Sequence, residues 1–188
     1  MIHAIVAPYT IQEHIKIHHA AAYAKVAYFY RLRNLPAVHA FLDTISHCEG
    51  TTGEDGYRRV YGSRTLIKDL SVHPGRDICR ISRGHKLCST AAGKYQFLRE
   101  TWDELVEKYG FGDFGPMSQD LAAISLLDRV GALEDIEHNR LTIAIKKAAH
   151  LWASLPTSPY GQPTKSMAEV KKVFRDRKIY YEHNRQEN

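Results

Sequence analysis

Residues 37–53 read AVHAFLDTISHCEGTTG, and this stretch joins a helical pattern to the most chemically suggestive residue of the chain. Apolar side chains recur at helical spacing through Phe41 and Ile45 to Cys48. Gly50 is the residue type that most readily adopts the left-handed conformation at a helix end. The stretch therefore predicts a helix that starts near Ala37 and stops at Gly50, with Glu49 at its carboxyl edge.

Two physical effects act on Glu49 at this place. The negative end of the helix dipole disfavours an ionised carboxylate. Partial burial beside Ile45 and Cys48 would raise the pKa of Glu49 in the same direction. A carboxyl group that stays protonated near neutral pH can serve as a general acid. The spacing alone leaves open the alternative that Glu49 is a surface residue that happens to precede a loop.

Helical periodicity returns on both sides of this stretch. A helix is predicted over residues 11–32, and Pro36 helps to end it because the residue before a proline is biased out of the helical region. Residues 51–90 are rich in glycine, arginine and β-branched side chains, with short extended runs at residues 57–61 and 65–67. This pattern predicts a small β-hairpin region with long loops. Further helices are predicted from Tyr95 to Gly110 and over residues 119–130, 141–155 and 166–179. The fold class is therefore α+β and mainly helical.

The composition is that of one globular domain with room for an appendage. The 188 residues are 44% hydrophobic and 25% charged, which excludes a disordered chain. A chain of this length buries about 70% of its unfolded surface without needing metal or disulfide staples. The net charge of +5 suggests an anionic partner. Residues 1–35 and 164–188 each carry +3, whereas the middle of the chain carries −1.

Neither a membrane span nor a secretion signal is expected. The longest weakly polar run, residues 20–30, is interrupted by Lys25 and falls short of the about 20 apolar residues that cross a bilayer. Residues 1–6 lack a lysine or arginine, and Pro8 and Glu13 break up the stretch after them. Attraction of the two basic ends to an anionic membrane or polysaccharide surface is the sharper interpretation of the charge, since no helix-turn-helix or RNA-binding signature supports a nucleic-acid partner.

The three cysteines do not form a metal-binding or disulfide-rich pattern. Cys48, Cys79 and Cys88 are an odd number with no CxxC pair, so we expect no metal site. We expect free buried thiols, although Cys79 and Cys88 could bridge across a hairpin under oxidising conditions.

Two further segments place an aromatic ring next to an amide. Tyr95 and Gln96 follow a run of small residues (STAAG) that permits close approach of the backbone. Tyr160 and Gln162 lie in residues 151–162 (LWASLPTSPYGQ), a loop rich in proline and glycine. A sugar offers an apolar face for stacking and hydroxyls for hydrogen bonds, so all four are candidate residues of a binding cleft. The alternative for Tyr95 is an ordinary tyrosine packed at a helix start.

The three segments together resemble one family. Residues 47–51 (HCEGT), 89–96 and 151–162 look like the matching stretches of the bacteriophage lambda endolysin family, lytic transglycosylases with a lysozyme-like fold. Shorter matches lie between them in the same order, at residues 56–57, 71–74, 118–120 and 131–133. The resemblance covers about residues 41–174. It implies a lysozyme-like catalytic domain over residues 36–188, with the small β-hairpin region after the helix that carries Glu49. Residues 1–35 would be an N-terminal helical extension.

The resemblance also implies a reaction. The family cleaves the β-1,4 bond between N-acetylmuramic acid and N-acetylglucosamine in peptidoglycan, and its single essential glutamate corresponds to Glu49. Glu49 would protonate the glycosidic oxygen and then accept a proton from the muramic-acid 6-hydroxyl, giving a 1,6-anhydro product. A hydrolytic muramidase would instead pair Glu49 with a second carboxylate about 5–9.5 Å away. Glu54, Asp55 and Asp69 are the candidates for that role. A peptidoglycan-binding module without catalysis is the third alternative.

The remaining expectations depend on this implied reaction. No cofactor is needed, and we expect a monomer that is made in the host cytoplasm and reaches the periplasmic peptidoglycan after a separate partner permeabilises the membrane. His73, before Pro74, either lines the upper lip of the cleft or orders its loop. The extension either packs on the domain through Ile11, Ile15, Val26 and Phe29 or contacts the envelope as an amphipathic segment.

Overall fold

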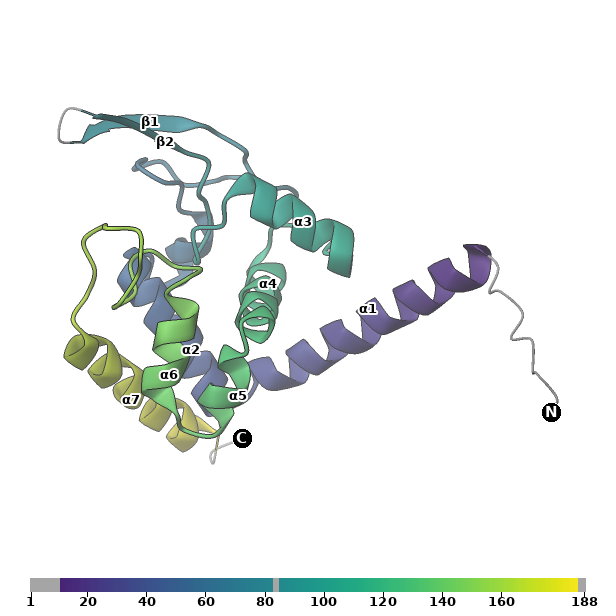
Figure 1. The fold of residues 1–188 in the computed structure, drawn as a ribbon. Helices are drawn as coiled ribbons and strands as arrows, with labels where there is room; N and C mark the ends of the chain where they lie inside the picture. The colour runs from purple at the N-terminus through teal and green to yellow at the C-terminus, as the bar shows by residue number, and fades with distance from the viewer. Residues whose placement is uncertain (1–10, 83–84, 186–188) are drawn as a thin grey trace, which may run out of the picture.

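The computed structural model describes residues 11–82 and 85–185 and shows a mainly helical chain with one two-stranded antiparallel hairpin (Figure 1). The α+β prediction is confirmed. In chain order the elements are α1 (Ile11–Arg33), α2 (Pro36–Glu49), the 3-10 helix η1 (Glu54–Arg58), β1 (Ile78–Ser82), β2 (His85–Ser89), α3 (Arg99–Tyr109), α4 (Pro116–Arg129), α5 (Ala132–Glu137), α6 (Leu141–Ala148) and α7 (Met167–Asn184). Among the described residues, the helices are all too short or too polar to traverse a lipid bilayer.

Helix α2 forms where the sequence predicts it, for local reasons. Pro36 occupies the first turn, where its missing N–H costs nothing. Gly50 ends the helix with φ +70°, and its N–H donates to the carbonyl of His47 at 3.2 Å. The helix packs along α7 and also touches α4 and α5 (Figure 1). Helix α2 is therefore held in place by its neighbours, and Glu49 lies at its C-terminal end.

The core lies between α2 and the helices around it. Every residue from 119 to 127 in α4 is buried, so α4 runs through the centre of the domain. An aromatic cluster covers one end of this core, where the Trp102 ring meets the Phe114 ring edge-on at a centroid distance of 4.6 Å. Each fully buried large apolar side chain contributes about 1.5–3 kcal/mol. The core therefore fixes α2 and α4 relative to each other.

Four predicted helices have clearly different bounds in the structure, and helix α5 is not predicted. Helix α4 starts at Pro116 rather than at residue 119, and helix α7 ends at Asn184 rather than at residue 179. The other two differ more. The helix predicted from Tyr95 begins only at Arg99, because residues 93–97 form a tight turn that is closed by backbone hydrogen bonds of 2.8 and 3.0 Å between Ala92 and Phe97. The helix predicted over residues 141–155 ends at Ala148, and an irregular segment follows it as far as residue 166. Helix α5 has only six residues, too few for a clear periodic pattern.

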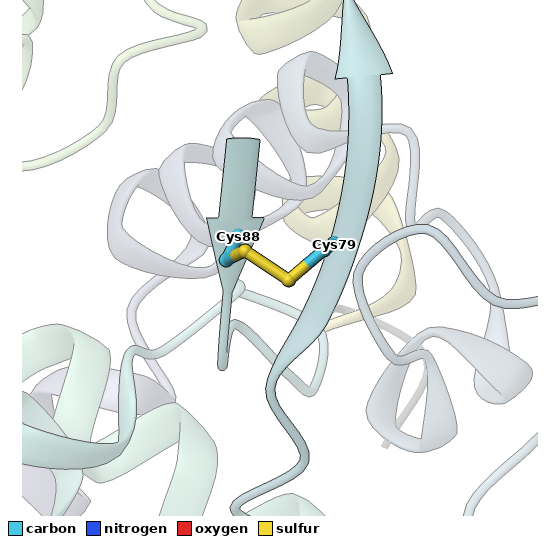
Figure 2. The surroundings of a disulfide bond; sticks show 2 residues. All are labelled: Cys79 and Cys88. Atoms are coloured by element: carbon cyan, nitrogen blue, oxygen red, sulfur yellow. A yellow bond between two sulfur atoms is a disulfide. The ribbon is translucent and has the colours of Figure 1, made fainter. Parts of the chain in front are cut away.

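The hairpin lies later in the predicted β region than the runs at residues 57–61 and 65–67. Tyr57 belongs to η1, whereas the strands are β1 and β2. Their register places Cys79 opposite Cys88, and the two sulfurs are bonded (Figure 2). The expectation of free buried thiols is therefore wrong for this pair: both residues are exposed and oxidised. Cross-strand pairing brings their Cα atoms to 3.9 Å, which the spacing in the sequence does not reveal. Cys48 is free and half-buried.

Helix α1 reaches away from the other helices toward the N-terminus, and its C-terminal half packs on α3 and α4 (Figure 1). Phe29 is fully buried in the core and Val26 packs against it, as predicted for an extension that packs on the domain. The side chains of Ile11 and Ile15, the other two predicted contacts, lie outside the described residues.

Candidate active site

Glu49 is the last residue of α2 and is only partly exposed. Its Oε1 accepts a hydrogen bond of 2.6 Å from the Ser154 hydroxyl. Burial raises the pKa of Glu49 above its usual range, and the Ser154 hydrogen bond opposes that shift without cancelling it. The direction agrees with the expectation from the sequence. A glutamate in this setting can hold a proton at higher pH than an exposed one, which is the property that a general acid needs.

Ser154 belongs to the irregular segment between α6 and α7, and its neighbours hold it in place. The Trp152 indole N–H donates to the carbonyl of Tyr95 at 2.9 Å, and Leu155 is fully buried. The carbonyl of Ser154 itself accepts from the N–H of Lys165 at 3.3 Å. In the sequence Ser154 is only one letter of a motif, and the pattern assigns it no role. Its place between two apolar anchors is the signal that could single it out.

Helix α4 holds the turn at residues 93–97 in place through Gln119. The side-chain oxygen of Gln119 accepts from the N–H of Lys94 at 2.8 Å, and Gly93 has φ +79° and no room for a Cβ beside Gln119. Gln96 also has a positive φ, +50°, and its amide donates to the carbonyl of Gly93 at 2.8 Å. Gln96 remains half-buried. The turn therefore presents Gln96 in a constrained conformation.

Tyr95 does not offer a stacking face. Its side chain is 1% exposed, and its hydroxyl donates to Asp120 Oδ1 at 2.6 Å. The prediction of Tyr95 as a sugar-contacting residue is therefore corrected by its burial, and the alternative of a packed tyrosine holds. The periodicity could not distinguish these cases, because a ring under a cleft and a ring in its wall are both apolar in the sequence.

Asp120 is the centre of a buried polar network behind the site. It is 0% exposed and also accepts from the Tyr57 hydroxyl at 2.9 Å and from Arg33 Nε at 2.6 Å. A buried carboxylate is tolerated only when donors satisfy it, and here three do. A buried cation, Lys94, lies 4.7 Å from the centre of the Tyr57 ring. This network ties η1, the 93–97 turn and α4 into one support.

His73 orders its loop rather than facing a ligand. The N–H of Gly75 donates to Nδ1 at 3.1 Å, so Nε2 carries the proton and donates to the carbonyl of Phe97 at 2.9 Å. The ring packs edge-on to Phe114. Burial lowers the pKa of His73, which favours this neutral tautomer. Both ring nitrogens are used, so the alternative of a loop-ordering histidine is the one that the geometry supports.

Tyr160 and Gln162 are exposed on the same irregular segment as Ser154. Tyr160 is 56% exposed, and its hydroxyl donates to the carbonyl of His150 at 2.7 Å, which limits the movement of the ring. These two residues are accessible to a ligand, unlike Tyr95.

The three carboxylates considered as second catalytic groups are all exposed. Glu54 and Asp55 lie in the first turn of η1, where negative charge is favourable. The Asp69 carboxylate accepts from both the N–H and the hydroxyl of Ser71, which lowers the pKa of Asp69. Each therefore has a local structural explanation.

Comparisons with known proteins identify the family and the fold. A family model described as Endolysin matches residues 39–178. The endolysin of Escherichia phage lambda is 38% identical over 129 residues, covering 65% of this chain and 79% of its own length, and that of Escherichia phage P2 is 37% identical over 151 residues, covering 73% and 90%. The structure of bacteriophage lambda lysozyme complexed with a chitohexasaccharide superimposes with a TM-score of 0.69 at 33% identity, over 76% of this chain and 94% of that one. A second lambda lysozyme structure gives 0.62 at 30%, over 79% and 93%. The fold is therefore that of lambda lysozyme, and the chain belongs to the endolysin family.

Proposed function

We propose that this endolysin, a peptidoglycan-degrading enzyme by family, is a lytic transglycosylase. It would cleave the β-1,4 bond between N-acetylmuramic acid and N-acetylglucosamine and form 1,6-anhydromuramic acid ends. The observation that carries the proposal is the state of Glu49: partly buried, with a raised pKa, and hydrogen-bonded on one oxygen to a neutral hydroxyl. The glycan ligand of the related lambda lysozyme supports a substrate of linked amino sugars.

The proposed reaction needs one carboxyl group and no water. Glu49 donates its proton to the glycosidic oxygen as the bond from that oxygen to C1 of muramic acid breaks. The 6-hydroxyl oxygen of the same muramic acid then bonds to C1, and its proton returns to Glu49. One bond is broken and one is formed within the substrate, and the enzyme ends in its starting protonation state. No cofactor takes part in these steps.

The surroundings of Glu49 favour this scheme over hydrolysis with two carboxylates. Burial and the Ser154 hydrogen bond shift the pKa of Glu49. Among the described residues, no ionised carboxylate contributes to this shift. The other candidate carboxylates are exposed and have local structural roles: Glu54 and Asp55 lie in the first turn of η1, and Asp69 accepts hydrogen bonds from Ser71. A single half-buried glutamate is the arrangement expected when the substrate supplies its own nucleophile.

Gln96, Tyr160 and Gln162 are the residues that we assign to substrate contact. Gln96 lies on the constrained 93–97 turn, whereas Tyr160 and Gln162 lie on the segment that carries Ser154. Amide groups suit sugar hydroxyls and acetamido groups because they both donate and accept, and a tyrosine ring suits an apolar sugar face. Tyr95 and His73 would not contact the substrate; they would hold the 93–97 turn and the neighbouring loop in place.

The role in the phage cycle follows from membership of the family. The enzyme would degrade the wall of the host from within and release progeny, acting on periplasmic peptidoglycan after another protein has permeabilised the inner membrane. Attraction of its basic ends to the anionic envelope would favour adsorption there.

Digestion of purified peptidoglycan followed by mass analysis of the muropeptides tests the reaction. Transglycosylation predicts products that lack the mass of one water molecule relative to hydrolysis products. Reducing-end muramic acid in the products of the wild-type enzyme would overturn the proposal.

The matched variants Glu49→Gln and Glu54→Gln test the catalytic assignment. Glu49→Gln keeps the shape and removes the acid proton, so it should abolish cleavage while the protein still sediments with peptidoglycan. Glu54→Gln makes the same chemical change at an exposed carboxyl and should retain activity. Full activity of Glu49→Gln, or loss of activity in Glu54→Gln alone, contradicts the assignment.

A further inference from the structure

Ser154 and Glu49 come from distant parts of the chain and meet at hydrogen-bond distance. The two residues are 105 positions apart, and the Ser154 hydroxyl donates to Glu49 Oε1 at 2.6 Å. The backbone of Ser154 is fixed from three sides: by the Trp152 indole on the carbonyl of Tyr95, by the buried Leu155, and by the Lys165 N–H on the carbonyl of Ser154 itself. Such a position leaves the hydroxyl little freedom to leave the carboxyl group.

A hydroxyl carries a single proton, and this limits what Glu49 can do with its two oxygens. As long as Ser154 donates that proton to Oε1, the acidic proton of Glu49 resides on Oε2. The same holds after the acid step, when the carboxylate is ionised and Oε1 still accepts from Ser154. The two oxygens are therefore not equivalent, and Oε2 is the one free to exchange protons with a substrate.

We propose that Ser154 is a positioning residue that anchors Glu49 Oε1 and thereby assigns every proton transfer of the reaction to Oε2. The inference rests on the proposed function, because it gives the acid step and the base step of transglycosylation to one oxygen atom. Glu49 Oε2–H protonates the glycosidic oxygen as its bond to C1 breaks, and the vacated Oε2 then accepts the 6-hydroxyl proton as the bond from O6 to C1 forms.

One oxygen performing both transfers has a geometric advantage. The carboxyl group need not rotate between the two steps. The glycosidic oxygen and the 6-hydroxyl only have to approach Oε2 one after the other. Orientation of reacting groups is one of the larger contributions to catalysis. The Ser154 bond also stabilises the ionised form, which opposes the effect of burial and keeps the proton transferable.

The test compares Ser154→Ala, Ser154→Thr and a control, Ser118→Ala. The Ser118 hydroxyl also donates to a carboxylate, Asp113 Oδ1 at 2.8 Å, but outside the site. Initial rates of peptidoglycan clearing are measured across pH, with thermal unfolding as a check on folding. Ser154→Ala should lose about tenfold in maximal rate, the size expected for a hydrogen bond to a charged group. It should also move the alkaline limb to higher pH, because the pKa of Glu49 rises when the donor is lost.

Rescue distinguishes positioning from a structural role. Ser154→Thr keeps the hydroxyl and should restore both the rate and the alkaline limb, whereas Ser118→Ala should resemble the wild-type enzyme. An unmoved limb in Ser154→Ala, or equal loss in the alanine and threonine variants, overturns the inference. Wild-type products that carry the mass of water would instead overturn transglycosylation, and the pH profiles would still judge Ser154 separately.

Discussion

Arg33 Nε donates to Asp120 Oδ2 at 2.6 Å and joins helix α1 to the centre of the domain. Asp120 lies within the region that matches the endolysin family model, whereas Arg33 precedes it. The Asp120 side chain is 1% exposed and that of Arg33 is 22% exposed, so the ion pair is largely shielded from water. Helix α1, which precedes the matched region, therefore supplies the charge that compensates the buried carboxylate of Asp120.

Replacing Arg33 with alanine should destabilise the protein by about 2 kcal/mol, because Asp120 keeps its two tyrosine donors but loses its cation. Urea unfolding monitored by far-UV circular dichroism measures the change. Arg31→Ala is the control, since Arg31 is exposed on the same helix and its loss should change stability by no more than about 0.5 kcal/mol. Equal effects of the two variants would show that α1 is not part of the network.

The elements that the sequence predicts well are those whose causes are local. Helix α2 has its periodic apolar face, its Pro36 start and its Gly50 stop within one segment, and the structure contains it as predicted. The predicted start of α3 is wrong. Tyr95 and Trp102 fit helical spacing and are both buried, but the backbone N–H of Lys94 donates to the side chain of Gln119 in α4. This hydrogen bond between residues that are distant in the sequence holds residues 93–97 in a turn instead of a helix.

The same reasoning explains which parts of the site could be predicted. The helical pattern and the stop at Gly50 place Glu49 at a helix end, and the resemblance of residues 47–51 to the endolysin family implies its catalytic role. The sequence assigns Ser154 no role, because a serine in a loop carries no pattern and its partner is 105 residues away. The pairing of Cys79 with Cys88 depends on strand register, which the two flanking sequences do not specify.

Glu49→Gln should make the stability of the protein less sensitive to rising pH. The folded-state pKa of Glu49 is raised above the unfolded value, 4.5, so wild-type Glu49 favours the folded state most when both states are protonated. That contribution is lost as pH rises through the folded-state pKa, because a partly buried charge forms. Glutamine does not titrate.

Thermal unfolding of the two proteins from pH 4 to pH 8 tests this sign. The difference in melting temperature between Glu49→Gln and wild type should be smallest at the acidic end and should grow in favour of the variant as pH rises. A variant that loses stability relative to wild type with rising pH would contradict the raised pKa.

Reduction of the Cys79–Cys88 bond should loosen the hairpin and leave the helical core unchanged. An isolated two-stranded hairpin is marginally stable in water, and Ile81 and Leu87 are 73% and 50% exposed, so few core contacts hold it. The covalent link restricts its open states. Hydrogen–deuterium exchange of the double variant Cys79→Ser/Cys88→Ser should be faster than wild type in peptides from β1 and β2 and unchanged in α2 and α4. Faster exchange throughout the chain would instead assign the bond a global role.

The native protein should react slowly with thiol reagents although it contains a free cysteine. Burial raises the pKa of the Cys48 thiol to about 12, and the neighbouring charge of Glu49 acts in the same direction. The thiolate is the reactive form, so very little of it exists at pH 8. Iodoacetamide labelling followed by mass spectrometry should show almost no modification before unfolding and one labelled cysteine after unfolding without reductant. Because Glu49→Gln removes the neighbouring negative charge, that variant should label faster than wild type at the same pH, and an unchanged rate would show that the two side chains do not influence each other.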